Sequence, residues 1–178
     1  MKTPARITKT VIILFVLSLA HLAPRNCVAE EWHSQELNCA VTLPTGGEWT
    51  QPTAPNPAIR AVAQTNDQAA SVFLMVVPLP NGSKLDDKFI RGYEDGHYQP
   101  GKSKKLSGVR LVIQGVPAYK STGELYVNGN TVQQVGVLWV VDGKLYQLAA
   151  LKRNAPPLED PAIRAFMASF HFLKPPSV

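Results

Sequence analysis

Hydrophobic residues along the chain fall into short alternating or wholly apolar runs separated by turn-forming residues. Residues 37–43 alternate between apolar and small or polar side chains, which predicts a strand with one buried face. Residues 59–64 alternate in the same way after a proline-rich stretch. The runs 70–77 and 135–141 are apolar on both faces, so each predicts a central strand that is covered on both sides.

A series of hairpins is predicted in the second half of the chain. Asn128-Gly129 and Asp142-Gly143 suit type I′ turns, because Asn, Asp and Gly tolerate the two positive φ angles that these turns require. The residues Gln-Gly-Val-Pro at 114–117 supply a further turn. The pattern therefore predicts an antiparallel meander with strands at 109–113, 118–127, 131–141 and 144–151.

Two amphipathic helices are predicted, one before the meander and one after it. Residues 83–98 carry an apolar stripe at four-residue intervals that includes Tyr93, and Ser83 can cap the N-terminus. The second helix follows Asp160, a favourable N-cap residue, with Pro161 at the first helical position. Two helices and about seven strands predict an α+β fold: a three-layer sandwich of one mainly antiparallel sheet with a helix on each side.

The N-terminus has the features of a secretory signal peptide. Basic residues precede an uncharged apolar run at 11–20, which is half the length of about 20 residues that a membrane-spanning helix needs. Small residues three positions and one position before the junction predict cleavage between Ala29 and Glu30. We therefore expect residues 1–29 to be a signal peptide and residues 30–178 to form one exported domain, periplasmic or extracellular, without a transmembrane segment.

Lipid attachment at Cys27 is the less favoured alternative. A bacterial lipobox has small residues directly before the cysteine, whereas this chain has Arg25 and Asn26. Cleavage after Ala29 would leave Cys39 as the sole thiol, and a lone cysteine in an apolar strand is usually a small buried hydrophobe.

The positive charge of the whole chain belongs largely to this N-terminal segment. Of the 18 Lys and Arg residues, four lie within residues 1–29, whereas none of the 13 acids does; the remainder has 14 basic against 13 acidic residues, a net charge of +1. A chain with so small a net charge gives no compositional support for nucleic-acid binding. The remaining basic cluster, Lys102–Lys105, has no interleaved aromatic residues, and we interpret it as a solvated loop.

Several short motifs resemble those of the PsbP-like superfamily. They are Leu43-Pro44 followed by Gly-Gly-Glu-Trp49, the segment Gly115–Tyr119, and the terminal helix closing on Ala168–Phe172. The resemblance covers most of residues 36–173, and its motifs concern packing, so no functional residue of the family transfers to this chain. It implies a non-catalytic binding or accessory domain. The superfamily includes an extrinsic photosynthetic subunit and a nuclear-import factor that binds Ran.

No catalytic or cofactor-binding motif stands out in the sequence. There is no Gly-x-Ser-x-Gly, phosphate-binding loop or His-Glu-x-x-His pattern, and we expect no cofactor. His33 with Glu36 and His97 with Glu94 have i, i+3 spacing, but two ligands of mixed type do not make a zinc site. His171 lies between Phe170 and Phe172, where a packed imidazole is the favoured interpretation.

Trp49 and Tyr93 are the candidate binding residues. Trp49 adjoins the proline-rich stretch, and its alternative role is a plug at one end of the sheet; Tyr93 lies on the first predicted helix. Three functions stay open at this point. The favoured one is an accessory module that binds an envelope protein or a small ligand. The others are a hydrolase or isomerase without a recognisable motif and a purely structural envelope protein.

Overall fold

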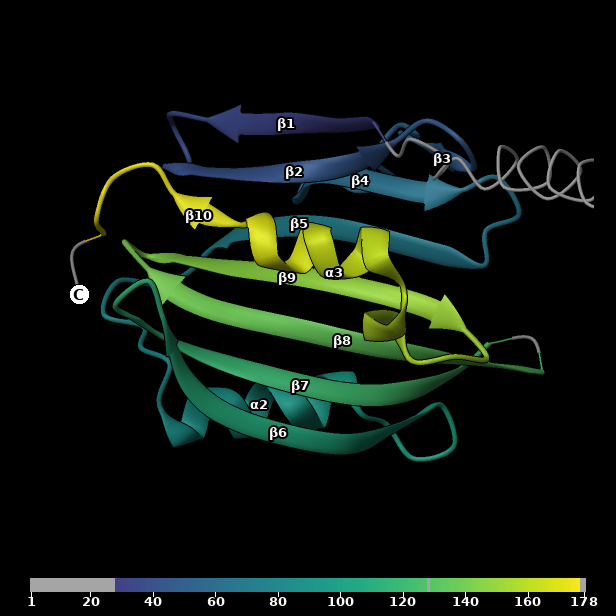
Figure 1. The fold of residues 1–178 in the computed structure, drawn as a ribbon. Helices are drawn as coiled ribbons and strands as arrows, with labels where there is room; N and C mark the ends of the chain where they lie inside the picture. Colours follow the sequence, from purple (N-terminus) through teal and green to yellow (C-terminus); the bar gives the residue numbers. More distant parts are fainter. Residues whose placement is uncertain (1–27, 128, 177–178) are drawn as a thin grey trace, which may run out of the picture.

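The structure is a computed structural model that describes residues 28–127 and 129–176. Its main sheet has seven strands, and every neighbouring pair in it is antiparallel (Figure 1). In spatial order they are β3 (Trp49–Thr50), β4 (Ile59–Thr65), β5 (Ala70–Pro78), β9 (Lys144–Arg153), β8 (Asn130–Val141), β7 (Val116–Val127) and β6 (Ser103–Ile113).

A second sheet of three strands, which the sequence did not predict, lies beside the main one. It has the order β1 (Val28–Ser34), β2 (Cys39–Thr45) and β10 (His171–Phe172). Residues 1–27 lie outside the described residues, and so do the expected signal-peptide features within them.

The predicted meander is confirmed from β6 to β9. At the β8–β9 turn, Asp142 and Gly143 have φ angles of 48° and 67°, as a type I′ turn requires. The β6–β7 turn is shorter than the predicted 114–117. Ile113 pairs with Val116, so Gln114 and Gly115 alone form the turn, and both have positive φ angles.

The first helix, α2 (Asp87–His97), is shorter than predicted and begins four residues later. Its N-cap is Asp86, whose carboxylate accepts a hydrogen bond from the Phe89 backbone N–H at 2.8 Å. Ser83, the predicted cap, instead donates its hydroxyl hydrogen to the Pro80 carbonyl oxygen. A carboxylate is a strong acceptor at a helix N-terminus and also favours its dipole.

The second helix, α3 (Pro161–Ser169), begins where it was predicted to begin, after a short 3₁₀ turn at Pro157–Glu159. The Asp160 side chain accepts hydrogen bonds from the backbone N–H groups of Ala162 and Ile163, which caps the helix. Within the described chain, no helix has the length and apolar character needed to cross a membrane.

The two faces of the main sheet belong to different hydrophobic clusters. Trp139 packs in one cluster and its neighbour Leu138 in the other, because successive side chains of a strand point to opposite faces. The first cluster includes Phe166 of α3 and the inner residues of β2, and we call this side the α3 face. The second cluster includes Ile90 of α2, and we call this side the α2 face.

An α+β fold with a seven-stranded antiparallel sheet and two helices is thus confirmed. We expected a single helix to cover the α3 face. Instead, both α3 and the second sheet lie over it, since β2 contacts α3 and β4 there. Tyr146 of β9 connects the main sheet to the turn between β1 and β2 by donating a hydrogen bond to the Leu37 carbonyl oxygen at 2.8 Å.

Candidate functional site

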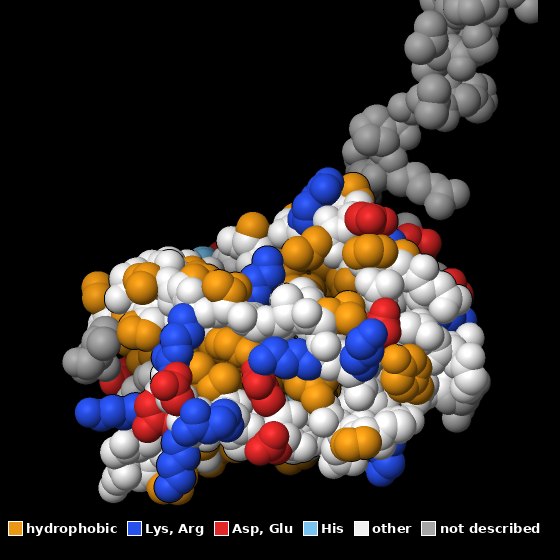
Figure 2. Space-filling view, turned by 90° about the horizontal axis from the view of Figure 1, so that it is seen from below, with side chains coloured by type: hydrophobic (Ala, Val, Ile, Leu, Met, Phe, Trp, Pro, Cys, Tyr) orange, Lys and Arg blue, Asp and Glu red, His pale blue; other side chains and the backbone are white. Residues whose placement is uncertain are grey.

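Strand β6 forms one outer edge of the main sheet, and among the described strands it pairs with β7 alone. Its residues Leu106, Val109 and Val112 are 48%, 53% and 68% exposed. Tyr126 and Val127, at the end of β7, complete the set of exposed large hydrophobic side chains in the described chain. Figure 2 views the molecule from the side of β6, the lowest strand in Figure 1, and shows hydrophobic side chains among charged ones. We call β6 with its exposed side chains the β6 edge.

Residues 103–105 of the basic cluster begin this strand, so our interpretation of the cluster as a loop was wrong for them, although Lys104 and Lys105 are exposed to solvent as expected. Lys104 pairs with Glu124 across the β6–β7 ladder, and Lys105 pairs with Gly123. Eight of the 11 residues of β6 are exposed, and the other three are half-buried. An outer strand of this kind needs no alternation of apolar residues, which is the signal that identifies a half-buried strand in a sequence.

Two ion pairs connect β6 to α2. The Lys105 ammonium lies 2.5 Å from the Glu94 carboxylate, and the Arg110 guanidinium lies 2.5 Å from that of Asp87. Partial burial opposes ionisation of Glu94, but hydrogen bonds from Lys105 and the Tyr119 hydroxyl outweigh it and lower the pKa of the Glu94 carboxyl. These two cations of β6 therefore already have counter-charges.

A cluster of aromatic and amide side chains lies between the C-terminal half of α2 and the sheet. The Tyr93 hydroxyl accepts a hydrogen bond from the Gln147 amide at 3.0 Å, and its ring stacks on His97 with the centroids 5.2 Å apart. A ring nitrogen of His97 lies 2.9 Å from the Gln134 amide oxygen. The Gln134 amide nitrogen also donates to the Tyr98 hydroxyl. These side chains satisfy one another's polar groups in a partly buried place.

Tyr93, one of the two predicted binding residues, is thus directed toward the sheet. Burial, together with the nearby Tyr98, Tyr119 and Glu94, raises the pKa of its hydroxyl well above the ordinary range, so Tyr93 stays neutral. Glu94 and His97 are engaged by different partners, Lys105 and Gln134, rather than by one another. Among the described residues, no group of three or more His, Cys, Asp or Glu side chains is placed to hold a metal ion.

Trp49, the other predicted binding residue, is 6% exposed and belongs to the cluster of the α3 face. This packing agrees with a plug and leaves little of the ring for a ligand. Cys39 is fully buried, as expected of a small hydrophobe, and burial raises the pKa of its thiol to about 12. His171 is partly buried, and its ring Nδ1 lies 3.0 Å from the Ser169 carbonyl oxygen.

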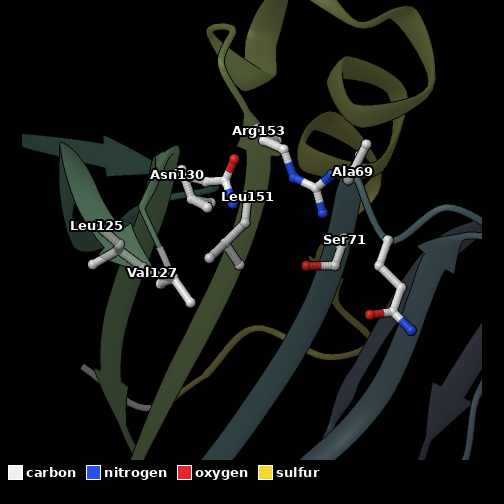
Figure 3. A pocket seen from close by; sticks show the side chains of 10 residues that line it. Ala69, Ser71, Leu125, Val127, Asn130, Leu151 and Arg153 are labelled. Carbon is white, nitrogen blue, oxygen red and sulfur yellow. The ribbon is translucent and has the colours of Figure 1, made fainter.

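A pocket of about 300 Å³ lies on the α2 face beyond the C-terminal end of α2. Figure 3 shows Leu151 at its centre, with Val127 on one side and Ser71 on the other, and Arg153 and Asn130 at the rim. The described lining residues include no Asp, Glu, His or Cys, so the pocket lacks the usual general acids and bases.

A wider hollow of about 750 Å³ lies at the N-terminal end of α2, near Leu85 and Arg110. Its lining includes three acids, of which Asp86 caps α2 and Asp87 pairs with Arg110. The third, Asp142, lies in the β8–β9 turn. Two of the three carboxylates thus already have structural partners.

No family model and no curated protein matches this sequence. Solved structures do match its fold. The solution structure of cyanobacterial PsbP from Synechocystis sp. PCC 6803 superposes with a TM-score of 0.57 at 13% identity, covering 84% of this chain and 95% of that one. The Ran-binding protein Mog1p of Saccharomyces cerevisiae superposes with a TM-score of 0.55 at 12% identity, covering 83% and 97%.

LpqN of Mycobacterium tuberculosis, described as involved in cell envelope biogenesis, superposes with a TM-score of 0.54 at 13% identity. The match covers 85% of this chain and 94% of LpqN. At sequence identities this low, the superpositions show a shared fold and nothing further. The resemblance seen in the sequence is confirmed at that level, and the chain has the PsbP-like fold.

Proposed function

We propose that this protein is a non-catalytic accessory domain of the cell envelope that docks onto another protein through the β6 edge. The observation that carries the proposal is the distribution of exposed apolar side chains. Val109 and Val112 are each more than half exposed, and the remaining exposed large hydrophobic residues of the described chain lie on β6 or at the adjoining end of β7. Exposed apolar side chains that lie along one strand edge among charged residues are typical of protein interaction surfaces.

The arrangement of the titratable groups supports binding rather than catalysis. Glu94, Asp87 and Asp160 are held in ion pairs with lysine or arginine, and Asp86 and Asp160 cap helices. The Cys39 thiol is buried with a raised pKa, which disfavours the reactive thiolate. The fold is shared with a Ran-binding protein and with a protein described as involved in cell envelope biogenesis.

Binding of a small ligand in the pocket of Figure 3 is the second candidate function. Its lining combines apolar residues such as Leu125 and Leu151 with the hydroxyl of Ser71 and the guanidinium of Arg153. A few polar groups around an apolar floor are typical of ligand sites. The pocket is at the small end of their usual size range, about 300 to 1,000 Å³, so we rank this function below docking.

Export is part of the proposal and rests on the N-terminal sequence. Cleavage after Ala29 would remove the first two residues of β1 and leave the rest of that strand, from Glu30, to pair with β2. N-terminal sequencing of the secreted protein is expected to begin at Glu30. A lipid-modified N-terminal Cys27 would contradict cleavage and place the protein on a membrane surface.

The docking surface can be tested with a double variant, Val109→Asp with Val112→Asp, which places two charges on exposed positions of the β6 edge. Thr50→Asp, on the exposed part of the opposite sheet edge, is the control. We expect cross-linking in the envelope fraction to join the wild type and the control to the same proteins, and the double variant to lose them. Equal capture by all three proteins would contradict docking at this edge, provided that urea unfolding shows all three folded.

A further inference from the structure

We propose that the docked partner adds an extended strand to β6, antiparallel to it, and that this strand has apolar residues followed by acidic residues toward its C-terminus. This inference rests on the proposed docking function and specifies how the β6 edge binds. In this mode of binding the partner forms hydrogen bonds with the backbone of β6 as well as contacts with its side chains. Docking through side chains alone would not involve the backbone.

The backbone of β6 is available for such pairing. The strand is 11 residues long and forms ladder pairs with β7 on one side, while in the described chain no strand lies on its other side. Its outward N–H and C=O groups therefore have no strand partner, and a row of such groups is a template for a further strand. The opposite edge of the sheet is β3, which has only two residues and therefore far fewer backbone groups for pairing.

The apolar side chains of β6 gather in the part of the strand that pairs regularly. The register with β7 shifts between Lys105 and Ser107, and the pairing is then continuous from Ser107 to Ile113. This stretch contains Val109, Leu111 and Val112 as well as Ile113. Because side chains alternate between faces, a partner strand would find valine, leucine or isoleucine side chains on both faces of this stretch. The irregularity limits the regular pairing to about seven residues.

The charges of β6 give the added strand a direction. Arg110 and Lys105 are already paired with acids of α2, whereas Lys104 is exposed and makes no ion pair among the described residues. Glu124 is the ladder partner of Lys104, but the two are not within ion-pair distance. Exposed Lys102 adds a further positive charge at this end. Every pair in the main sheet is antiparallel, so a strand that continues the pattern would bring its C-terminal residues to the Lys104 end.

A second copy of the same strand is a poorer occupant. Antiparallel pairing of residues 107–113 with themselves would place Arg110 directly opposite Arg110 of the other copy, and like charges in that position are destabilising. A shift that removes this clash by bringing in the N-terminal end would place Lys104 against apolar residues of the other copy. An acidic partner meets neither difficulty.

Four synthetic peptides test the proposal on the purified protein. The first, Thr-Val-Thr-Val-Thr-Val-Thr-Thr-Glu-Glu, has the proposed order and the ten residues needed to span Ile113 to Lys104. The second has the same residues reversed. The third and fourth repeat the first with alternate backbone nitrogens methylated, the third in one register and the fourth in the other, so that one of them cannot donate the ladder hydrogen bonds to β6. Binding and the exchange of backbone N–H groups in β6 are followed by NMR.

We expect the first peptide to bind and to slow amide exchange along residues 107–113. The reversed peptide is expected to bind about threefold more weakly, as for the loss of a cross-strand charge pair. The variant Lys104→Glu is expected to weaken the first peptide by a similar factor, whereas Lys84→Glu, an equal charge change on an exposed residue outside β6, leaves it unchanged. Methylation in one of the two registers is expected to abolish binding.

Equal binding of both methylated peptides and their parent would overturn strand addition while leaving docking through side chains intact. Equal binding of the forward and reversed peptides would overturn the proposed direction. A failure of all peptides to bind, with capture still lost in the Val109→Asp and Val112→Asp double variant, would also reject strand addition but not docking. A concentration-dependent dimer that slows exchange in β6 without any peptide would identify a second copy as the occupant and overturn the proposal.

Discussion

The two faces of the main sheet are held by different kinds of interaction. The α3 face has a continuous apolar core in which Trp139, Tyr146, Phe166 and Leu148 are almost completely buried. On the α2 face, the buried cluster has only four members, Ile90, Tyr119, Leu138 and Leu145. Partly buried hydrophobic side chains such as Phe89 and Val140 pack around this cluster, and hydrogen bonds and ion pairs of long polar side chains complete the α2 contact.

This difference separates stability from function in the molecule. Burial of apolar area is the dominant favourable contribution to folding, so the α3 face is expected to hold the domain together. The β6 edge is joined to α2 by two ion pairs, and Val132 and Leu151 of the pocket in Figure 3 lie on the same face of their strands as Leu138 and Leu145, the side with fewer buried apolar contacts. Regions with few such contacts open at a lower free-energy cost, and binding segments are often drawn from them.

The largest expected effect on the free energy of unfolding comes from removing a buried ring from the core of the α3 face. Phe166→Ala removes a ring that is 1% exposed and is expected to lower the free energy of unfolding by about 3 to 5 kcal/mol. Ile90→Ala, at a position that is 7% exposed on the α2 face, is expected to cost about 2 kcal/mol, the lower end for such substitutions. Urea unfolding of both variants measures the difference, and an equal cost would contradict the division of roles.

The second prediction concerns the close approach of α2 to the sheet. A Cβ atom added at Gly123 would meet the ring of Tyr98 and would lie 2.8 Å from the Lys104 carbonyl oxygen. Gly123→Ala is therefore expected to cost about 1 to 3 kcal/mol through overpacking. Gly136→Ala is the control, because its added Cβ would meet nothing nearer than 3.9 Å. Similar urea midpoints for the two variants would show that Tyr98 moves away at little cost.

The sequence predicted the meander because its signals are local. Asp142-Gly143 specifies its own turn, and the flanking apolar runs follow from the same few residues. The second sheet was missed because β10 pairs with β2 across more than 120 residues, and no local pattern encodes that contact. The first half of β6 was missed because its exposed lysines give no periodic signal.

The candidate site was harder to predict than the fold. Trp49 and Tyr93 were singled out as large aromatic residues near predicted surface features, but both side chains are directed toward the protein interior. The β6 edge becomes visible only when it is known that β6 is the last strand of the sheet. Strand order is a property of the whole chain, so residues 103–113 alone do not reveal it.

A third prediction compares the caps of the two helices. Asp160 caps α3 and lies 2.8 Å from the Lys152 ammonium, whereas Asp86 caps α2 without an ion pair among the described residues. Asn is an equally good N-cap residue, so Asp160→Asn removes the ion pair and leaves a cap in place. We expect it to cost about 1 kcal/mol at pH 7 and Asp86→Asn to cost less.

The Asp160 ion pair also predicts a pH dependence. Partial burial opposes ionisation of Asp160, but Lys152 and the helix N–H groups outweigh it and hold its pKa below the ordinary value of 3.8. As the pH falls, the Asp160 carboxylate therefore becomes protonated in the unfolded chain before it does so in the folded protein. The contribution of this carboxylate to folding stability is present above about pH 4 and is lost as the pH falls through the folded-state pKa. The gap in stability between wild type and Asp160→Asn should therefore narrow as the pH falls below about 4, toward the folded-state pKa of Asp160. A constant gap would contradict this origin.

The smallest effects are expected from two glycines that differ in backbone conformation. Gly143, in the β8–β9 turn shared by both faces, has a φ angle of 67°, and an added Cβ would meet no atom within 4 Å. Gly143→Ala therefore isolates the cost of a left-handed backbone, about 1 kcal/mol.

Gly92 lies exposed within α2 and also has free space around an added Cβ, but its φ angle is not positive. Because Ala favours helix more than Gly does, Gly92→Ala is expected to stabilise the protein by about 0.5 to 1 kcal/mol. Urea midpoints should thus shift in opposite directions. A fall for both variants would show that the α2 region does not tolerate even a methyl group on its outer side, and it would contradict the view that this face is lightly packed.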